Sequence, residues 1–207
     1  MSILQLSRKA PALAAVAILA AIVPKPAAAQ GGVNLVPWAG VYVPTRNNVS
    51  KLGADIFQRD VSVIGGARLT FWGTGNLGFE ATGGYAPAKF SGATINEGNS
   101  NLLVASGRLL FSPTPVTDRV SFYIGAGPAL LTRGRNTFDD DKSHTDFGGT
   151  AGIGFRFALG ESGNSAVRLD FEDYLYNGDF GGGDKFQNDL VGSLGISLSL
   201  GGRASEQ

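Results

Sequence analysis

The segment Asp146-Phe-Gly-Gly-Thr-Ala-Gly-Ile-Gly-Phe-Arg-Phe157 alternates, residue by residue, between two kinds of side chain. Its odd-numbered positions carry Phe, Gly, Ala and Ile, whereas its even-numbered positions carry Asp, Thr and Arg together with Gly. Because successive side chains of a β-strand point to opposite faces, the segment is predicted to be a strand with one apolar and one polar face.

Comparable segments recur along the rest of the chain and predict eight strands. The first of them is rich in residues that favour strands, but its faces cannot be assigned from the sequence. The predicted strands cover Val33–Pro44, Val61–Phe71, Leu77–Tyr85, Leu103–Phe111, Val120–Leu130, Asp146–Phe157, Val167–Leu175 and Asp189–Leu200.

The length and the two-faced character of these strands favour a membrane protein. Strands of globular proteins usually have about five or six residues, whereas a tilted membrane strand needs about 9–11. An apolar face suits lipid, a polar face suits the inside of a barrel, and the barrel must close because a sheet edge in lipid is costly. The predicted fold is all-β: an eight-stranded antiparallel up-and-down transmembrane barrel.

The connections between the predicted strands alternate between short and long. Membrane barrels have short periplasmic turns and longer outer loops, so both ends of the mature chain are expected in the periplasm. The short links are 73–76, 112–118 and 160–164, and the long links are 45–60, 87–100, 133–145 and 177–187.

Aromatic residues on the apolar faces agree with this orientation. Phe71, Phe111 and Phe157 end three descending strands and are expected to form a periplasmic girdle, because aromatic rings favour membrane interfaces. Tyr85 and Phe147 are expected near the opposite rim.

The first 29 residues have the pattern of a secretory signal peptide. Arg8 and Lys9 precede the apolar run Pro11–Val23, and Ala27–Ala29 supply small residues before a cleavage site. An uncleaved anchor is the alternative, but the run is short for a bilayer, which takes about 20 apolar residues. The expected domains are a leader over 1–29 and a barrel over 30–207.

The composition excludes several classes of function. The chain has no Cys, so thiol catalysis, Cys-ligated zinc and a disulfide framework are excluded. It balances 17 basic against 17 acidic residues and has no basic cluster, so no nucleic-acid partner is expected.

The segments Ser121–Pro128 and Gly148–Arg156, together with the order of strands and loops, resemble the small eight-stranded outer-membrane barrels. This family includes the transmembrane domain of outer-membrane protein A, the outer-membrane protein X type and the opacity proteins. The resemblance implies a porin-like barrel in a Gram-negative outer membrane. It also implies contact with lipid and lipopolysaccharide, and with periplasmic chaperones and the barrel-assembly machinery during biogenesis.

One feature departs from that family. Its members commonly end the last strand on an aromatic residue, whereas this chain ends the strand with Ser197–Gly201.

We expect the protein to be a monomer.

Seven charged residues fall on the predicted inner faces. Eight strands leave an interior that side chains can fill, and unpaired charges there would be costly. Both the pattern and the resemblance therefore predict a buried ion-pair network. Its members are Arg68, Glu80, Arg108, Arg156, Arg168, Asp170 and Glu172.

Four functions are compatible with this pattern. The leading hypothesis is a structural or surface-interaction barrel whose loops carry any binding, since loops on a rigid scaffold commonly carry specificity. The others are a narrow channel for small solutes or ions, a lipid-modifying enzyme using His144 as general base, and a soluble barrel with an apolar ligand inside. We expect no catalytic residue, because no nucleophile and orienting acid can be placed beside His144.

Three smaller features have ordinary explanations. Asp139–Asp141, Asp179 and Asp184 are expected to be solvated loop acids, so no metal or cofactor is predicted. Asp173 falls on the apolar face near the outer end of its strand, where a charge costs less than at the midplane. The inner glycines are expected to leave room for the Arg side chains, and they are Gly125, Gly127, Gly152, Gly154 and Gly195.

Overall fold

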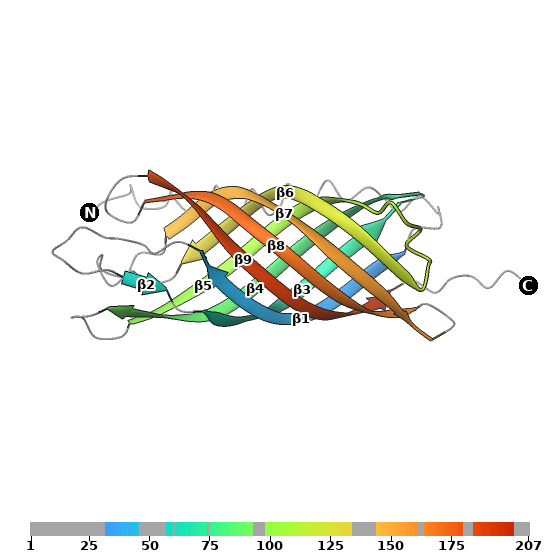
Figure 1. Ribbon diagram of the computed structural model, residues 1–207, viewed down its shortest axis with the longest axis horizontal. Helices are drawn as coiled ribbons and strands as arrows, with labels where there is room; N and C mark the ends of the chain where they lie inside the picture. Colours follow the sequence, from blue (N-terminus) through green and yellow to red (C-terminus); the bar gives the residue numbers. More distant parts are fainter. Residues whose placement is uncertain are drawn as a thin grey trace, which may run out of the picture.

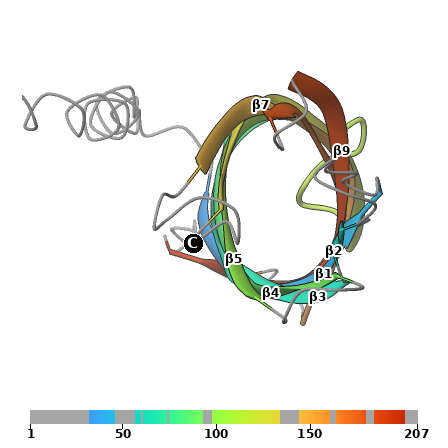
Figure 2. The ribbon, with the colours of Figure 1, turned by 90° about the vertical axis from the view of Figure 1, so that its left-hand side faces the viewer.

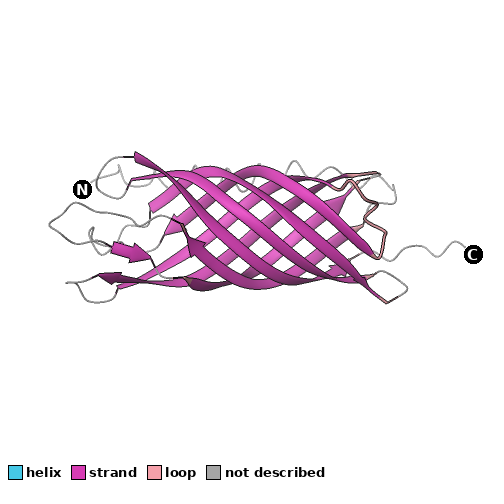
Figure 3. Ribbon diagram, viewed as in Figure 1, coloured by secondary structure: helices cyan, strands magenta, loops and turns pink. Residues whose placement is uncertain are grey.

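The computed structural model describes residues 32–45, 57–59, 61–73, 75–92, 98–133, 144–160, 164–179 and 184–200. All elements in these ranges are strands (Figure 3). They are β1 Val33–Pro44, β2 Phe57–Arg59, β3 Ser62–Trp72, β4 Leu77–Gly92, β5 Gly98–Phe111, β6 Val120–Arg133, β7 His144–Leu159, β8 Ser165–Asp179 and β9 Asp184–Ser199. Within the same ranges, no helix is long and apolar enough to cross a membrane.

The strands close into an antiparallel barrel. Apart from the short β2, each strand pairs with its neighbours in sequence, and β1 closes the ring by pairing with β9 (Figures 1 and 2). The short β2 pairs with residues 90–92 of β4, and β3 pairs with residues 78–85 along the same edge of β4. Since β2 and β3 occupy one position in the ring, the barrel has eight positions, and the predicted fold is confirmed.

The stagger of the strands can be followed through the pairings. A path from Val33 steps to the directly opposite residue on each strand and returns to β1 at Val43, ten residues further along. The path is Val33, Phe71, Phe79, Leu109, Ala126, Ala151, Asp173, Leu190 and Val43. Such a stagger makes the strands tilt about the barrel axis, typically by about 35–45°.

The two faces of the wall differ as the alternation predicts. Leu109 is 72% exposed and Phe147 is 71% exposed on the outside, whereas Arg68 and Arg108 are buried inside. Phe122 and Phe155 lie side by side on neighbouring strands with ring centroids 6.5 Å apart. An exterior of aliphatic and aromatic side chains around a charged interior is the inverse of a soluble barrel.

The strands run further than the apolar pattern indicated, so three predicted long links are too long. β4 continues to Gly92 and β5 begins at Gly98, inside the predicted link 87–100. The links 133–145 and 177–187 are shortened in the same way, and β2 lies within the predicted link 45–60.

The two ends of the barrel are named here by their connections. The turn end carries the short links and the residues Val33 and Ser199, which are close to each other because Asn34 pairs with Ser199. The loop end carries Pro44, Arg133 and Asp184.

Candidate functional site

Six charged side chains meet in the turn-end half of the lumen. Arg68, Glu80 and Arg108 come from β3, β4 and β5 in turn. Arg168, Asp170 and Glu172 come from alternate positions of β8, which all face inward. Each of the six residues is at most 3% exposed. We call this group the charged cluster.

The charged cluster pairs three guanidinium groups with three carboxylates. Arg168 contacts Glu80 Oε2 at 2.7 Å and Asp170 Oδ1 at 2.9 Å. Arg108 contacts Glu172 Oε1 at 2.7 Å and is also paired with Glu80. Arg68 lies 3.3 Å from Glu172 and 3.5 Å from Asp170. Three positive and three negative groups make the cluster neutral as a whole, and every carboxylate contacts at least two arginines.

Neutral groups add hydrogen bonds and a ring contact to these charges. Thr70 donates its hydroxyl to Glu80 at 2.6 Å and accepts from Arg168 at 2.9 Å. The Tyr123 hydroxyl donates to Asp170. The Arg68 guanidinium lies over the Trp38 ring, 4.4 Å from its centroid. Buried charges are tolerated when they are paired and hydrogen-bonded in this way.

Arg156 was grouped with these residues from the sequence, but the structure places it elsewhere. It is half-buried and donates to the backbone carbonyl of Val116, between β5 and β6, at 2.9 Å. Arg156 lies three residues from the turn-end limit of β7 at Leu159, so its side chain reaches the turn. The alternation of residues along β7 predicted correctly that Arg156 lies on the inner face. It could not predict the position of Arg156 along the barrel axis.

A second polar group lies near the loop end of the lumen. The hydroxyls of Tyr42 and Tyr176 both donate to Asp189 Oδ2 at 2.5 Å. Arg133 is paired with Asp146 and lies over the Tyr176 ring, 4.7 Å from its centroid. The sequence analysis did not predict this group, in part because the faces of the first strand were unassigned.

Between the two polar groups lies a set of apolar side chains, here called the apolar layer. Ile64, Val104, Leu131 and Val191 are each at most 1% exposed and belong to one cluster. Ile64 and Val104 each lie four residues towards the loop end from an arginine of the charged cluster. Leu131 and Val191 each lie two residues from Arg133 and Asp189, on the side away from the loop end. The apolar layer therefore separates the two polar groups along the barrel axis.

The turn end of the lumen is closed by a smaller apolar group. Trp72 packs edge-on against Tyr123, with ring centroids 5.9 Å apart, and Leu110 and Val116 complete the group. The charged cluster thus has apolar neighbours on both sides along the axis.

The inner glycines make room for more than arginine. A Cβ at Gly152 would crowd Arg108, as the sequence predicted. A Cβ at Gly154 would overlap the Tyr123 ring, and one at Gly125 would overlap Leu110. The expectation that these glycines leave room for Arg side chains therefore applies to Gly152, whereas Gly154 and Gly125 make room for an aromatic and an aliphatic side chain.

Three of the residues considered for catalysis or metal binding lie at the loop end. His144 begins β7, opposite Arg133, and Asp179 pairs with Asp184 across β8 and β9. Asp139–Asp141 lie outside the described residues. In the ranges that the structure covers, no group of three or more His, Cys, Asp or Glu is arranged to hold a metal ion.

Comparison with known proteins matches residues 12–201 to the family described as the outer membrane protein beta-barrel domain. The chain belongs to this family. The recognition made from the sequence is therefore confirmed, and the protein is placed in the outer membrane. No curated protein matches the sequence significantly.

Solved structures of similar fold are small outer-membrane barrels. Neisserial surface protein A is 14% identical with a TM-score of 0.58, over 83% of this chain and 99% of that one. OprG from Pseudomonas aeruginosa is 13% identical with a TM-score of 0.53, over 83% and 94%. Ail of Yersinia pestis, solved with the heparin analogue sucrose octasulfate, is 12% identical with a TM-score of 0.52, over 82% and 98%. At these identities the likeness shows the fold alone.

Proposed function

We propose that this outer-membrane barrel is a non-conducting scaffold that anchors in lipid and presents its loop end for surface interactions. The apolar layer carries the proposal. A narrow lumen lined by Ile64, Val104, Leu131 and Val191 offers an ion no hydration, and hydrophobic constrictions block conduction by excluding water. The charged cluster is then a structural brace for the wall and not a permeation path.

Planar-bilayer recording tests this proposal directly. The purified protein, inserted at known density beside a porin as positive control, should give no steady conductance in 1 M KCl. A reproducible single-channel current from the heat-modifiable, folded protein would overturn the proposal in favour of the narrow channel.

We also propose that the barrel has no catalytic activity. The proposal rests on the sequence, in which no nucleophile and orienting acid can be placed beside His144, the one histidine of the chain. A mass-shift assay on outer-membrane lipids incubated with the protein should show no modified species. Loss of a measured lipid modification in His144→Ala would revive the enzyme hypothesis.

We further propose that residues 1–29 are a cleaved leader and that the turn end of the barrel faces the periplasm. Amino-terminal sequencing of the membrane-inserted protein should begin at Gln30. A tag placed after Gln207 should resist protease added to intact cells, because the turn end would face the periplasm.

A further inference from the structure

The link between β5 and β6 reaches strands that it does not connect. Residues 112–119, here called the strap, leave β5 at the turn end and return to β6. Val116 of the strap packs against Trp72, which belongs to β3. The Val116 carbonyl accepts a hydrogen bond from Arg156 on β7 at 2.9 Å. The strap therefore extends across the lumen, and Figure 2 shows this yellow-green segment projecting into the outline of the ring.

Hydrogen bonds near both ends of the strap fix where it leaves the wall and where it returns. The Thr114 hydroxyl accepts from the Phe122 amide of β6 at 3.3 Å. The Arg119 carbonyl accepts from the Ala158 amide of β7 at 2.8 Å. Between these two anchors, the middle of the strap meets the far wall through Val116.

The strap covers the turn-end opening of the lumen. Ser121 is the second residue of β6, so it lies at the rim of the barrel, and it is directly opposite Arg156 on β7. An inward side chain at an open rim would meet water, yet Ser121 is 1% exposed. The hydrogen bond between Arg156 and Val116 joins β7 to the strap beside this position. The strap therefore closes over Ser121.

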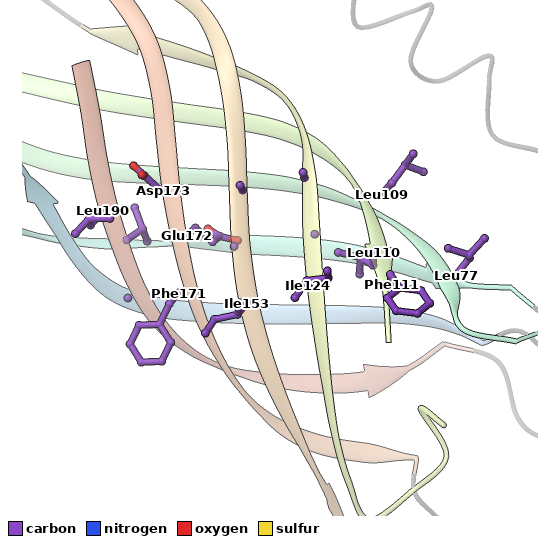
Figure 4. Close-up of a pocket in the computed structure, with 16 residues that line it drawn as sticks. Leu77, Leu109, Leu110, Phe111, Ile124, Ile153, Phe171, Glu172, Asp173 and Leu190 are labelled. Atoms are coloured by element: carbon purple, nitrogen blue, oxygen red, sulfur yellow. The ribbon is translucent and has the colours of Figure 1, made fainter. Parts of the chain in front are cut away.

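The strap is held more weakly than the wall beneath it. Leu110 is buried in the apolar group at the turn end, whereas its neighbours Leu109 and Phe111 point outward from β5 (Figure 4). Val116 packs on this apolar group and is itself half-buried. A segment held by one half-buried side chain and a few hydrogen bonds opens locally at a lower free energy than paired strands do.

We infer that the strap is a lid over the turn end of the lumen, latched by Arg156, and that its opening admits solutes from that end towards the charged cluster. Opening breaks the hydrogen bond from Arg156 to the Val116 carbonyl and separates Val116 from Trp72. A lid that opens locally slows the entry of solutes without abolishing it. The inference concerns the turn end, so it is independent of whether the apolar layer excludes ions.

Because the chain has no Cys, a single introduced thiol can report on the lid. Ser121→Cys places a thiol under the strap, and Thr117→Cys places one on the exposed surface of the strap. The purified full-length protein is treated with a charged methanethiosulfonate reagent, and mass spectrometry follows the rate of labelling. The thiol of Ser121→Cys should react about a hundredfold more slowly than that of Thr117→Cys. This factor is expected from one hydrogen bond and one half-buried aliphatic side chain.

Variants added to Ser121→Cys test the latch. Arg156→Met keeps the length of the side chain but has no donor, so labelling should become about fivefold faster, as the loss of one hydrogen bond implies. Val116→Ala should also speed labelling, because it removes packing against Trp72. Arg119→Met is the matched control: this side chain is exposed, its backbone carbonyl is retained, and the rate should not change. A shift between folded and boiled gel bands confirms that each variant folds.

Several results would overturn the inference. Equal labelling rates for Ser121→Cys and Thr117→Cys would show that the strap leaves the opening uncovered. A rate that neither Arg156→Met nor Val116→Ala changes would show that the strap is a fixed part of the wall.

The route of the reagent is tested by adding Val104→Ser and Leu131→Ser to Ser121→Cys. An unchanged labelling rate supports entry past the strap, whatever conductance these substitutions produce. A rate that rises as much as in Arg156→Met would show that the reagent enters from the loop end, and would also overturn the inference.

Discussion

Two regions of the lumen, the charged cluster and the apolar layer, are enclosed by the same eight-stranded wall and filled by opposite chemistry. In the turn-end half, three arginines and three carboxylates join β3, β4, β5 and β8 through ion pairs. In the apolar layer, between this cluster and the polar group near the loop end, the aliphatic side chains of Ile64, Val104, Leu131 and Val191 pack together. In the proposed function, the charged cluster braces the wall and the apolar layer closes the lumen, so the two tasks fall to different residues.

The largest expected effect follows from polar substitution of the apolar layer. Val104→Ser with Leu131→Ser should admit water and give measurable conductance in planar bilayers, because the hydrophobic barrier is lost. Arg168→Ala should stay silent in the same recordings, since the apolar layer remains intact. Conductance from Arg168→Ala alone would mean that the charged cluster is the seal.

The next largest effect is on stability. Arg168→Ala removes one partner of Glu80 and Asp170 and should lower the free energy of unfolding by about 3–5 kcal/mol. Urea titration in lipid vesicles, followed by the fluorescence of Trp38 and Trp72, measures this change. Adding Glu80→Ala should cost less than its own single substitution, because the charge that it removes has already lost one of its arginine partners.

A smaller effect is expected from the space that glycine leaves inside the barrel. Gly154→Ala would force a methyl group into the Tyr123 ring and should destabilise the protein by about 1–3 kcal/mol. Gly83→Ala is the matched control, because a Cβ there meets nothing within 4 Å. Equal losses in the two variants would show that the cost is a backbone effect and not crowding.

The smallest effect concerns the charged residue outside the cluster. Arg156→Ala loses a hydrogen bond to the Val116 carbonyl and should cost about 1 kcal/mol in the same urea titration. A loss as large as that of Arg168→Ala would place Arg156 energetically within the charged cluster.

Alternation in the sequence was sufficient to predict the fold and most of the charged cluster. It placed Arg68, Arg108 and Glu80 on inner faces because their neighbours are clearly apolar. It could not place Val104 or Leu131, because both faces of β5 and β6 are apolar near the loop end. The position of Arg156 along the barrel axis also depends on the register between neighbouring strands, which the alternation within one strand does not predict.

The pairing of β1 with β9 makes the first and last strands of the domain neighbours. The hydrogen bond from Tyr42 to Asp189 joins residues 147 positions apart. A chain truncated before Asp184 would leave β1 and β8 each with a bare edge in hydrocarbon, where unpaired backbone groups are costly. The barrel can therefore close in the membrane only after the last strand has been synthesised and has paired with the first.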